Sequence, residues 1–422
     1  MFFRRGRLSA KEARARLIEL FDHHYQWPLR TPILHLLARG DPLRFLYALC
    51  FLVDQVGRGV YLLNQRRPAE QRPWFADDLE AAVAALAIQP ANLAQRLALV
   101  MRLDDPAAAE LEVRRLLLEI IDLTPQEKKR GQQEDEQPLL PWLPWSADLQ
   151  TPAETPTLPP GDAADWMRIA QQAVRIVWRL PGSRLAALTG SVAAGYADLV
   201  SEIDVGLFGL KLPQADVRRS LIAATSALPA DITQLTQDRY AADIFWLEDH
   251  GPGGDRYQIT VRYFLIAEAQ RLIEHPLPES RMEEELLAHL STAQILVDYE
   301  LRGPDLLREL QQATQRARPE RVARAASGLD LALAHLHAGS DSAGFFYGTV
   351  EALLALFQLL AARNDRWIIF PKSTAAWLDS LQHVPVDVHE RLSAIALLPF
   401  RPENLAVKLE TLSALAQEAQ AL

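Results

Sequence analysis

Apolar residues follow two different patterns along this chain, and the change between them predicts its architecture. Continuous apolar runs at 185–191 and 203–210 are separated by a turn of small residues, which predicts two buried strands with a short connection. Beyond about Arg281 the apolar positions recur about every 3.6 residues, as in 283–301 and 350–364, and predict helices alone. The chain is therefore expected to be α+β.

A polar and then proline-rich stretch, 128–161, predicts a semi-rigid linker between folded parts. Before it, 1–127 is expected to form a helical domain. After it, 162–278 is expected to form the sheet domain, with a leading helix over 165–180 that ends at a Pro-Gly pair. A second predominantly helical bundle is expected over 279–422. The predicted fold is a small mixed-sheet domain flanked by two helical bundles.

The two ends of the chain share a pattern at a constant offset of 300 residues, at which Arg72 also meets Lys372. Identical residues occur in the pairs His35 and His335, Leu36 and Leu336, Ala38 and Ala338, Asp41 and Asp341, Phe45 and Phe345, Tyr47 and Tyr347, and Asn64 and Asn364. These identities predict an internal repeat, in which the N-terminal region is a copy of the C-terminal bundle. Two unrelated bundles of similar composition are the alternative.

Composition narrows the class of protein. At 422 residues and 49% hydrophobic content, the chain can bury more than one core. Its net charge of −10 argues against an extended nucleic-acid partner, which requires clustered Lys and Arg. The single cysteine, Cys50, excludes an intrachain disulfide and fits a reducing cytoplasm. The charged opening and the lack of a long uncharged apolar run predict neither secretion nor a membrane span.

The turn after the first predicted strand carries the candidate chemistry. Gly190 can adopt the positive φ that aims successive backbone N–H groups at one point, and Ser191 adds a hydroxyl, which suits a polyphosphate. Glu202 and Asp204 flank Ile203 and, because strand side chains alternate, point the same way, roughly 6 to 7 Å apart. Two such carboxylates can share one or two Mg²⁺ ions of a nucleoside triphosphate. A tight hairpin with solvated acids is the alternative.

The spacing G-S-x-A-x-G, then five residues, then S-E-I-D-V resembles the signature of the nucleotidyltransferase superfamily related to DNA polymerase beta, especially its antibiotic-modifying aminoglycoside and lincosamide branch. The resemblance implies that Gly190 and Ser191 hold the triphosphate of ATP or another NTP. It implies that Glu202 and Asp204 bind two Mg²⁺ ions during attack of an acceptor on the α-phosphorus. It also implies that the C-terminal helical domain closes over substrate and nucleotide, with Lys372 reaching the phosphates.

The chain departs from that family's pattern in two places. Glu202 stands where aspartate is usual, and its additional methylene shifts the carboxylate. Most active members also carry a third acid on a later strand. The equivalent strand here, which follows a turn-rich hairpin loop, offers Gln258, Thr260 and Arg262 at the candidate positions. Asp243 in the preceding strand is the best substitute, with a solvated edge or turn residue as its alternative.

The offset of 300 residues also links two basic loops. Lys372 follows the N-x-R sequence of Asn364 and Arg366, which are expected to shape its loop, and Arg72 takes the corresponding place near the N-terminus. A solvated loop lysine is the alternative for Lys372. Because no strand domain comes directly before the first bundle, that bundle is expected to serve in packing, in a homodimer or as a lid.

Two functions remain open. The chain is either an enzyme that transfers a nucleoside monophosphate from Mg-NTP to a hydroxyl of a small molecule or protein, or a catalytically degenerate relative that binds nucleotide or a partner protein. An acid within about 3 to 4 Å of the Glu202 and Asp204 carboxylates would favour the enzyme. A basic or apolar side chain there would favour the binding module. Either is expected in the cytoplasm, with no membrane and no extended nucleic acid as partner.

Overall fold

The computed structural model describes residues 7–21, 29, 33–67, 79–124, 163–195, 197, 202–225, 231–237, 240–248, 256–339, 341–368 and 374–422. The chain divides into two compact units. One comprises Met1–Thr155, Leu329–Leu354 and Asp387–Gln417, and the other Pro156–Gly328, Ala355–Val386 and Glu418–Leu422. The division falls inside two long helices, α13 (Gly303–Ala338) and α14 (Ser342–Arg363), and the four segments expected from the sequence stay a prediction.

The second of these units contains one mixed sheet of six strands in the order β3-β4-β5-β2-β1-β6. The strands are β1 (Ser183–Thr189), β2 (Ile203–Gly209), β3 (Asp231–Gln237), β4 (Tyr240–Glu248), β5 (Arg256–Leu265) and β6 (Gln294–Asp298). Neighbouring strands are antiparallel except for β2 and β5, which are parallel. The expected α+β class is confirmed, as are the two apolar strands β1 and β2.

Two further local predictions are confirmed in the same unit. Strands β4 and β5 pair antiparallel, with Ala242 opposite Arg262, as the turn-rich segment between them indicated. The helix expected before β1 is α8 (Ala163–Val177), and a Pro-Gly pair follows it, with Gly182 at a φ of 89°. Both features depend only on local sequence, since turn residues and apolar periodicity act over a few positions.

The expectation of helices alone after Arg281 is wrong at one place. The run QILVD forms β6, which pairs antiparallel with β1 at the edge of the sheet. This run has only five residues and follows directly on α12 (Arg281–Ser291), so its period could be read as a continuation of that helix. Pairing with β1 decided its conformation, because β1 would leave backbone groups unpaired along one side without β6.

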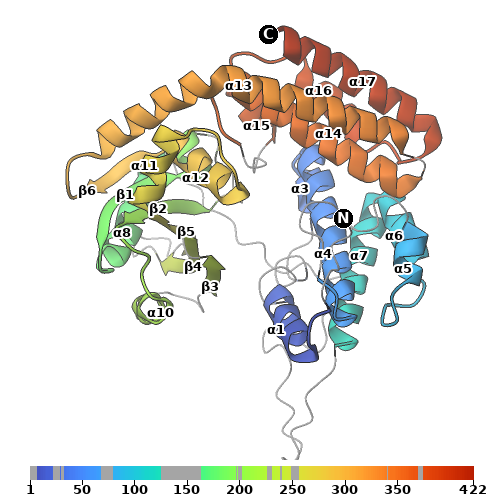
Figure 1. The fold of residues 1–422 in the computed structure, drawn as a ribbon, viewed down its shortest axis with the longest axis horizontal. Helices are drawn as coiled ribbons and strands as arrows, with labels where there is room; N and C mark the ends of the chain where they lie inside the picture. Colours follow the sequence, from blue (N-terminus) through green and yellow to red (C-terminus); the bar gives the residue numbers. More distant parts are fainter. Residues whose placement is uncertain are drawn as a thin grey trace, which may run out of the picture. The chain divides into compact units, whose positions relative to one another are not determined.

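The sheet is covered on both faces, as Figure 1 shows. Ile203, Val205 and Leu207 of β2 belong to a core with α8 and α10 (Ala215–Ala223). The intervening residues face the other side, where Phe208 packs with α11 (Ile266–Glu274), α12 and the start of α13. Strand alternation therefore sends Asp204 to the side of α12.

The remaining elements are helical. They are α1 (Ala10–Leu20), α3 (His35–Ala38), α4 (Pro42–Leu63), α5 (Leu79–Ala84), α6 (Leu93–Arg102), α7 (Pro106–Asp122), α15 (Thr374–Asp379), α16 (Val388–Ala396) and α17 (Pro402–Ala421). By length and composition α4 and α14 could each span a membrane, but 67% and 83% of their most apolar stretches are buried inside the protein. Burial of this extent is typical of core helices.

The two helices α4 and α14 have closely similar ends. Each has 22 residues, and the two start 300 positions apart. The carboxylate of Asp41 accepts from the backbone N–H three residues further on at 3.1 Å, and the carboxylate of Asp341 does the same at 2.8 Å. These contacts satisfy one of the backbone N–H groups that a helix start leaves without a partner.

The turns after these two helices also share their hydrogen bonds. The amide nitrogen of Asn64 donates to the carbonyl four residues earlier at 2.8 Å and to the Ile88 carbonyl at 2.6 Å. Asn364 donates to the corresponding carbonyl at 2.8 Å and to the His383 carbonyl at 2.8 Å. In each turn the side-chain amide oxygen of the Asn accepts two hydrogen bonds from backbone N–H groups. The donors come shortly after the next short helix, which is α5 in one case and α15 in the other. The residue after each Asn has a positive φ, 56° in one and 54° in the other.

Candidate functional site

The turn between β1 and the short helix α9 (Gly190–Ala194) lies against the Asp204 side chain. Gly190 has a φ of 69°, and a Cβ placed on it would overlap the Asp204 carboxylate. Only glycine meets both conditions without strain. The Ser191 hydroxyl is buried and has no hydrogen-bond partner among the described residues. The structure thus brings Gly190, Ser191 and Asp204 together, as the sequence predicted.

The two acids share one side of the sheet, and each is engaged by a residue of β5. Asp204 lies opposite Thr189 of β1 and Thr260 of β5, and it is 2% exposed. Glu202 directly precedes β2. Its carboxylate accepts from the Gln258 amide at 3.0 Å and from the Thr260 hydroxyl. Gln258 and Thr260 are therefore bound to Glu202 at the positions where a third acid was sought.

The guanidinium of Arg262 binds the other acid. Its Nη2 lies 3.4 Å from Asp204 Oδ1, and its Nε donates to Nε2 of His289 on α12 at 2.7 Å. Because Nε2 accepts, the proton of the neutral ring is on Nδ1, which lies 3.1 Å from Thr189 Oγ1. The Thr189 hydroxyl donates to the Asp204 carbonyl at 3.4 Å. A closed network of Arg262, His289 and Thr189 thus holds Asp204 from both its side chain and its backbone.

These contacts do not fit two Mg²⁺ ions. Two carboxylates and one guanidinium carry one net negative charge, whereas three carboxylates would carry three. Within the described part of the chain, no cluster of three His, Cys, Asp or Glu side chains could hold a metal ion. Mg²⁺ sites are built from oxygen ligands and waters in octahedral geometry, and a guanidinium supplies no lone pair.

Asp243 cannot replace the missing third acid, because it lies on the opposite face of the sheet from Asp204. It is fully buried and lies 3.1 Å from Arg218 of α10. Burial raises the pKa of Asp243 to about 6, against the opposing effect of Arg218. Asp243 is therefore a buried partner of α10 rather than a member of the acid pair or a solvated edge residue.

The helical candidates have mixed outcomes. Lys372, expected to reach the phosphates, and its counterpart Arg72 lie outside the described residues. Asn364 does shape its turn, through the four hydrogen bonds given above. Arg366 comes two residues later, and its backbone carbonyl accepts from Arg321, whose guanidinium also stacks on Trp367 at 3.6 Å.

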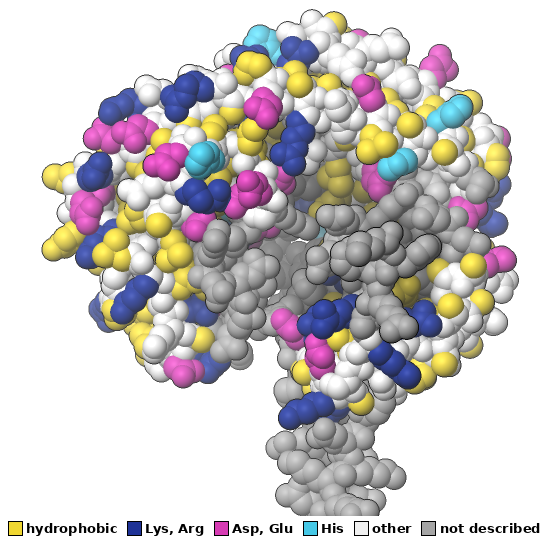
Figure 2. Space-filling view, in the orientation of Figure 1, with side chains coloured by type: hydrophobic (Ala, Val, Ile, Leu, Met, Phe, Trp, Pro, Cys, Tyr) yellow, Lys and Arg dark blue, Asp and Glu magenta, His cyan; other side chains and the backbone are white. Residues whose placement is uncertain are grey.

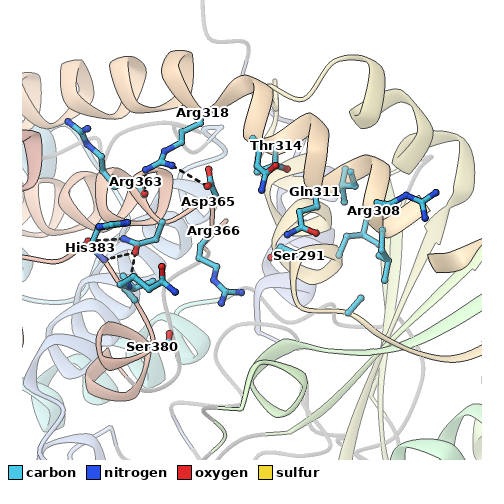
Figure 3. Close-up of a pocket in the computed structure, with 18 of the residues that line it drawn as sticks. Ser291, Arg308, Gln311, Thr314, Arg318, Arg363, Asp365, Arg366, Ser380 and His383 are labelled. Atoms are coloured by element: carbon cyan, nitrogen blue, oxygen red, sulfur yellow. Dashed lines mark hydrogen bonds and ion pairs between the residues drawn. The ribbon is translucent and has the colours of Figure 1, made fainter. Parts of the chain in front are cut away.

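A cavity of about 770 Å³ lies beside this turn, and Figure 3 shows part of its lining. Its walls come from the end of α12, β6, the first half of α13, and the turns after α14 and α15. The lining residues are Leu290, Ser291, Ala293, Ile295, Pro304, Leu307, Arg308, Leu310, Gln311, Thr314, Gln315, Arg318, Arg363, Asn364, Asp365, Arg366, Ser380, Leu381, Gln382 and His383. Neither Gly190 nor Asp204 is among them. The cavity is therefore a second site candidate in the same unit.

Sequence reasoning missed His289 and Thr189. Both act only through the network around Asp204, and neither forms a motif with its own neighbours. The available signal for His289 was a lone histidine among leucines in LLAHL, a pattern more typical of a core residue. Thr189 directly precedes Gly190, so its place at the end of β1 could have suggested a role.

No protein-family model matches this chain, and no curated protein matches it. Among solved structures, the chain is similar to a nucleotidyltransferase-like protein from Exiguobacterium sibiricum 255-15. The match has 8% sequence identity, covers 58% of this chain and 74% of that chain, and has a TM-score of 0.28. A similarity of this size transfers no chemistry, so function must be argued from this chain's own contacts.

Proposed function

We propose that this chain is a nucleotidyltransferase-like protein that has lost metal-dependent transfer and acts as a binding module. The observation that carries the proposal is the Arg262 guanidinium on Asp204, where an active site would hold a metal ion. A basic side chain at this position was the outcome expected for a degenerate relative. The retained Gly190 turn then serves packing against Asp204 rather than cradling a metal-bound triphosphate.

Electrostatics supports this reading. A guanidinium about 4 Å from a metal ion is repelled by about 4 kcal/mol for each unit of metal charge, at the effective dielectric constant of about 20 that suits protein sites. Arg262 is also fixed by His289, so moving it away would break a hydrogen bond of 2.7 Å as well as the ion pair. The single net negative charge of Glu202, Asp204 and Arg262 leaves little to offset these costs.

Among the described residues around Asp204, none is evident as a general base. Transfer to a hydroxyl needs a group that accepts the hydroxyl proton. Glu202 accepts hydrogen bonds from Gln258 and Thr260, and Asp204 faces Arg262. Both carboxylates are held as structural acceptors, which favours binding over catalysis.

The proposal is tested by titrating Mg²⁺, Mg-ATP and Mg-GTP into the wild type, Asp204→Ala and Arg262→Asp by calorimetry. We expect no Mg²⁺ binding to the wild type and no effect of Asp204→Ala on nucleotide binding. Arg262→Asp supplies a third carboxylate and should create measurable Mg²⁺ binding. Release of pyrophosphate from Mg-ATP or Mg-GTP by the wild type, lost in Asp204→Ala, would overturn the proposal.

Partners and location are part of the proposal. On the face in Figure 2, Lys and Arg side chains are interspersed with Asp and Glu, without a continuous basic stripe. Together with the net charge of −10, this supports a small ligand or a protein partner over extended nucleic acid. The mostly buried α4 and α14 support a cytoplasmic protein rather than a membrane-spanning one.

We also infer that α3 to α7 and the C-terminal end of α13 through α17 are two copies of one helical unit. The matching lengths of α4 and α14, their Asp caps and their Asn-centred turns support this inference. Swapping the tetrapeptides that carry the turns, 64–67 and 364–367, tests it. Copies of one unit should tolerate the exchange with a small loss of stability, and unfolding of the chimera would contradict the inference.

A further inference from the structure

We propose that the cavity beside the Asn364 turn binds a phosphate monoester without a metal ion, with Arg366 as the residue that contacts the phosphate. This deepens the proposed function, because it gives the binding module a ligand class and a site. The lining contains four arginines, at 308, 318, 363 and 366, and a single acid, Asp365. In a chain with a net charge of −10, so basic a lining indicates an anionic ligand.

Three of these arginines already have partners. Arg318 lies 3.4 Å from the Asp365 carboxylate and donates to the Arg363 carbonyl at 2.6 Å. Arg363 itself donates to the Gln420 carbonyl. Arg308 pairs with Asp305 on the exposed side of α13, and in Figure 3 it points away from the cavity. These side chains supply positive charge, but their hydrogen bonds are largely committed to the fold.

Arg366 differs from them. Within the described residues its guanidinium has no hydrogen bond or ion pair, and in Figure 3 it extends into the open space beside the turn. Arg66, at the same place in the turn after α4, instead donates to the Ala85 carbonyl at 2.8 Å. Both turns keep the same Asn-centred hydrogen bonds, so neither needs its arginine in order to form. The guanidinium of Arg366 is thus available for a ligand, whereas that of Arg66 is used internally.

The opposite wall of the cavity also offers hydrogen-bonding groups. In Figure 3 the Gln311 side chain faces the same space as Arg366, with Ser291 and Thr314 nearby. Thr314 is buried, and its oxygen accepts from the Trp367 indole at 3.2 Å, which fixes the hydroxyl. Among the described residues this hydroxyl donates to no partner, so its proton is available for an acceptor on a ligand. A guanidinium facing such donors suits the acceptor oxygens of a phosphate.

The rest of the lining suits the organic part of a phosphate monoester. It is formed by the apolar residues Leu290, Ala293, Ile295, Pro304, Leu307, Leu310 and Leu381. A volume of about 770 Å³ lies within the range of roughly 300 to 1,000 Å³ that small-molecule sites occupy. Inorganic phosphate alone would leave this apolar surface uncovered, so a monoester with an apolar body is expected to bind more tightly.

The test titrates inorganic phosphate, AMP and uncharged adenosine into the full-length protein in EDTA. AMP should bind, inorganic phosphate more weakly, and adenosine at least about ten-fold more weakly than AMP, because a charge-assisted hydrogen bond contributes a factor of this order. Arg366→Gln should weaken AMP binding about ten-fold or more. The matched control Arg66→Gln should leave it unchanged, since Arg66 lines a different turn. Thermal unfolding of both variants verifies that they fold.

The outcomes separate this site from the Asp204 site. Absence of AMP and phosphate binding, equal binding of AMP and adenosine, or equal losses in the two Arg variants would overturn the inference. AMP binding that requires Mg²⁺ and is lost in Asp204→Ala would overturn it too, by assigning the ligand to the acid pair. Pyrophosphate release from Mg-NTP would defeat the proposed loss of transfer while leaving metal-free AMP binding at Arg366 intact.

Discussion

Among the described residues, each face of the sheet carries an Asp–Arg pair, and the two pairs differ in what surrounds them. Asp243 and Arg218 lie 3.1 Å apart, and both side chains are almost completely buried. Asp204 and Arg262 lie 3.4 Å apart, with 21% of the Arg262 side chain exposed. Arg218 joins α10 to the sheet, whereas Arg262 joins β5 to Asp204 of β2 and to His289 of α12. The same two residue types therefore form a fully buried pair on one face and a partly exposed pair on the other.

The largest expected effect is on the fully buried pair. Arg218→Met leaves the Asp243 carboxylate without its cation and should lower the free energy of unfolding by about 3 to 5 kcal/mol at pH 8. The loss should shrink at pH 5, because Asp243, with a folded pKa of about 6 even beside Arg218, is then protonated. Urea unfolding at both pH values measures this. The neighbouring exposed Arg219→Met should change stability by less than about 0.5 kcal/mol. An equal loss in both variants would show that burial does not distinguish these arginines.

Another buried cation, Lys408, sharpens the comparison, because no carboxylate of the described residues pairs with it. Lys408 is 1% exposed, donates to the Ile395 carbonyl and lies 4.0 Å from the Phe400 ring. Burial lowers its pKa to about 7 from 10.5. The unfolded lysine keeps its proton up to about pH 10.5 while the folded one loses it above about 7, so stability should rise with pH across this window.

The variant Lys408→Met removes the free-energy cost of burying a charged ammonium group. The variant should be more stable than the wild type by up to about 5 kcal/mol below pH 7, where both states of the wild type are protonated, and the gain should fall towards zero near pH 10. Urea unfolding at pH 6.5, 8 and 9.5 follows the change. A gain that does not vary with pH would mean that Lys408 does not titrate in the folded protein.

The contact between the Gly190 turn and Asp204 can also be tested by substituting Gly190. Gly190→Ala combines a φ of 69° with overlap against the carboxylate and should cost at least about 2 kcal/mol of stability. Gly195→Ala is the control, since Gly195 has a φ of 80° but no described atom within 4 Å of an added Cβ. It should cost only the backbone strain, about 1 kcal/mol. Equal costs would mean that Asp204 moves aside freely.

The smallest expected change in stability comes from the partly exposed pair of Asp204 and Arg262. Arg262→Met should lower stability by about 1 to 2 kcal/mol, less than Arg218→Met, because solvent reaches part of the site and Thr189 still holds the Asp204 backbone. Arg262→Lys should recover part of the loss by keeping the charge. Chemical denaturation of the three proteins side by side decides the order. A larger loss for Arg262→Met than for Arg218→Met would reverse the comparison drawn between the two faces.

Much of the Asp204 site could be anticipated from local patterns. Alternation along a strand placed Asp204 and Glu202 on one side, and it placed Gln258, Thr260 and Arg262 on one side of β5, before any neighbour was known. The hairpin of β4 and β5 followed from its turn residues. Strand alternation does not tell which residue each of these side chains contacts. The cavity beside Arg366 was equally out of reach, since its walls come from five separate segments.

By itself the sequence determined the helix before β1, the helical character of the chain on both sides of the sheet, the strands β1, β2, β4 and β5, and the glycine turn at the start of α9. Only the tertiary structure decided that β5 lies parallel to β2, which brings Arg262 onto Asp204 and leaves Asp243 on the far face. It also turned QILVD into an edge strand. Side-chain direction and turn geometry depend on a few adjacent residues, whereas strand neighbours depend on which distant segments bury their apolar faces together.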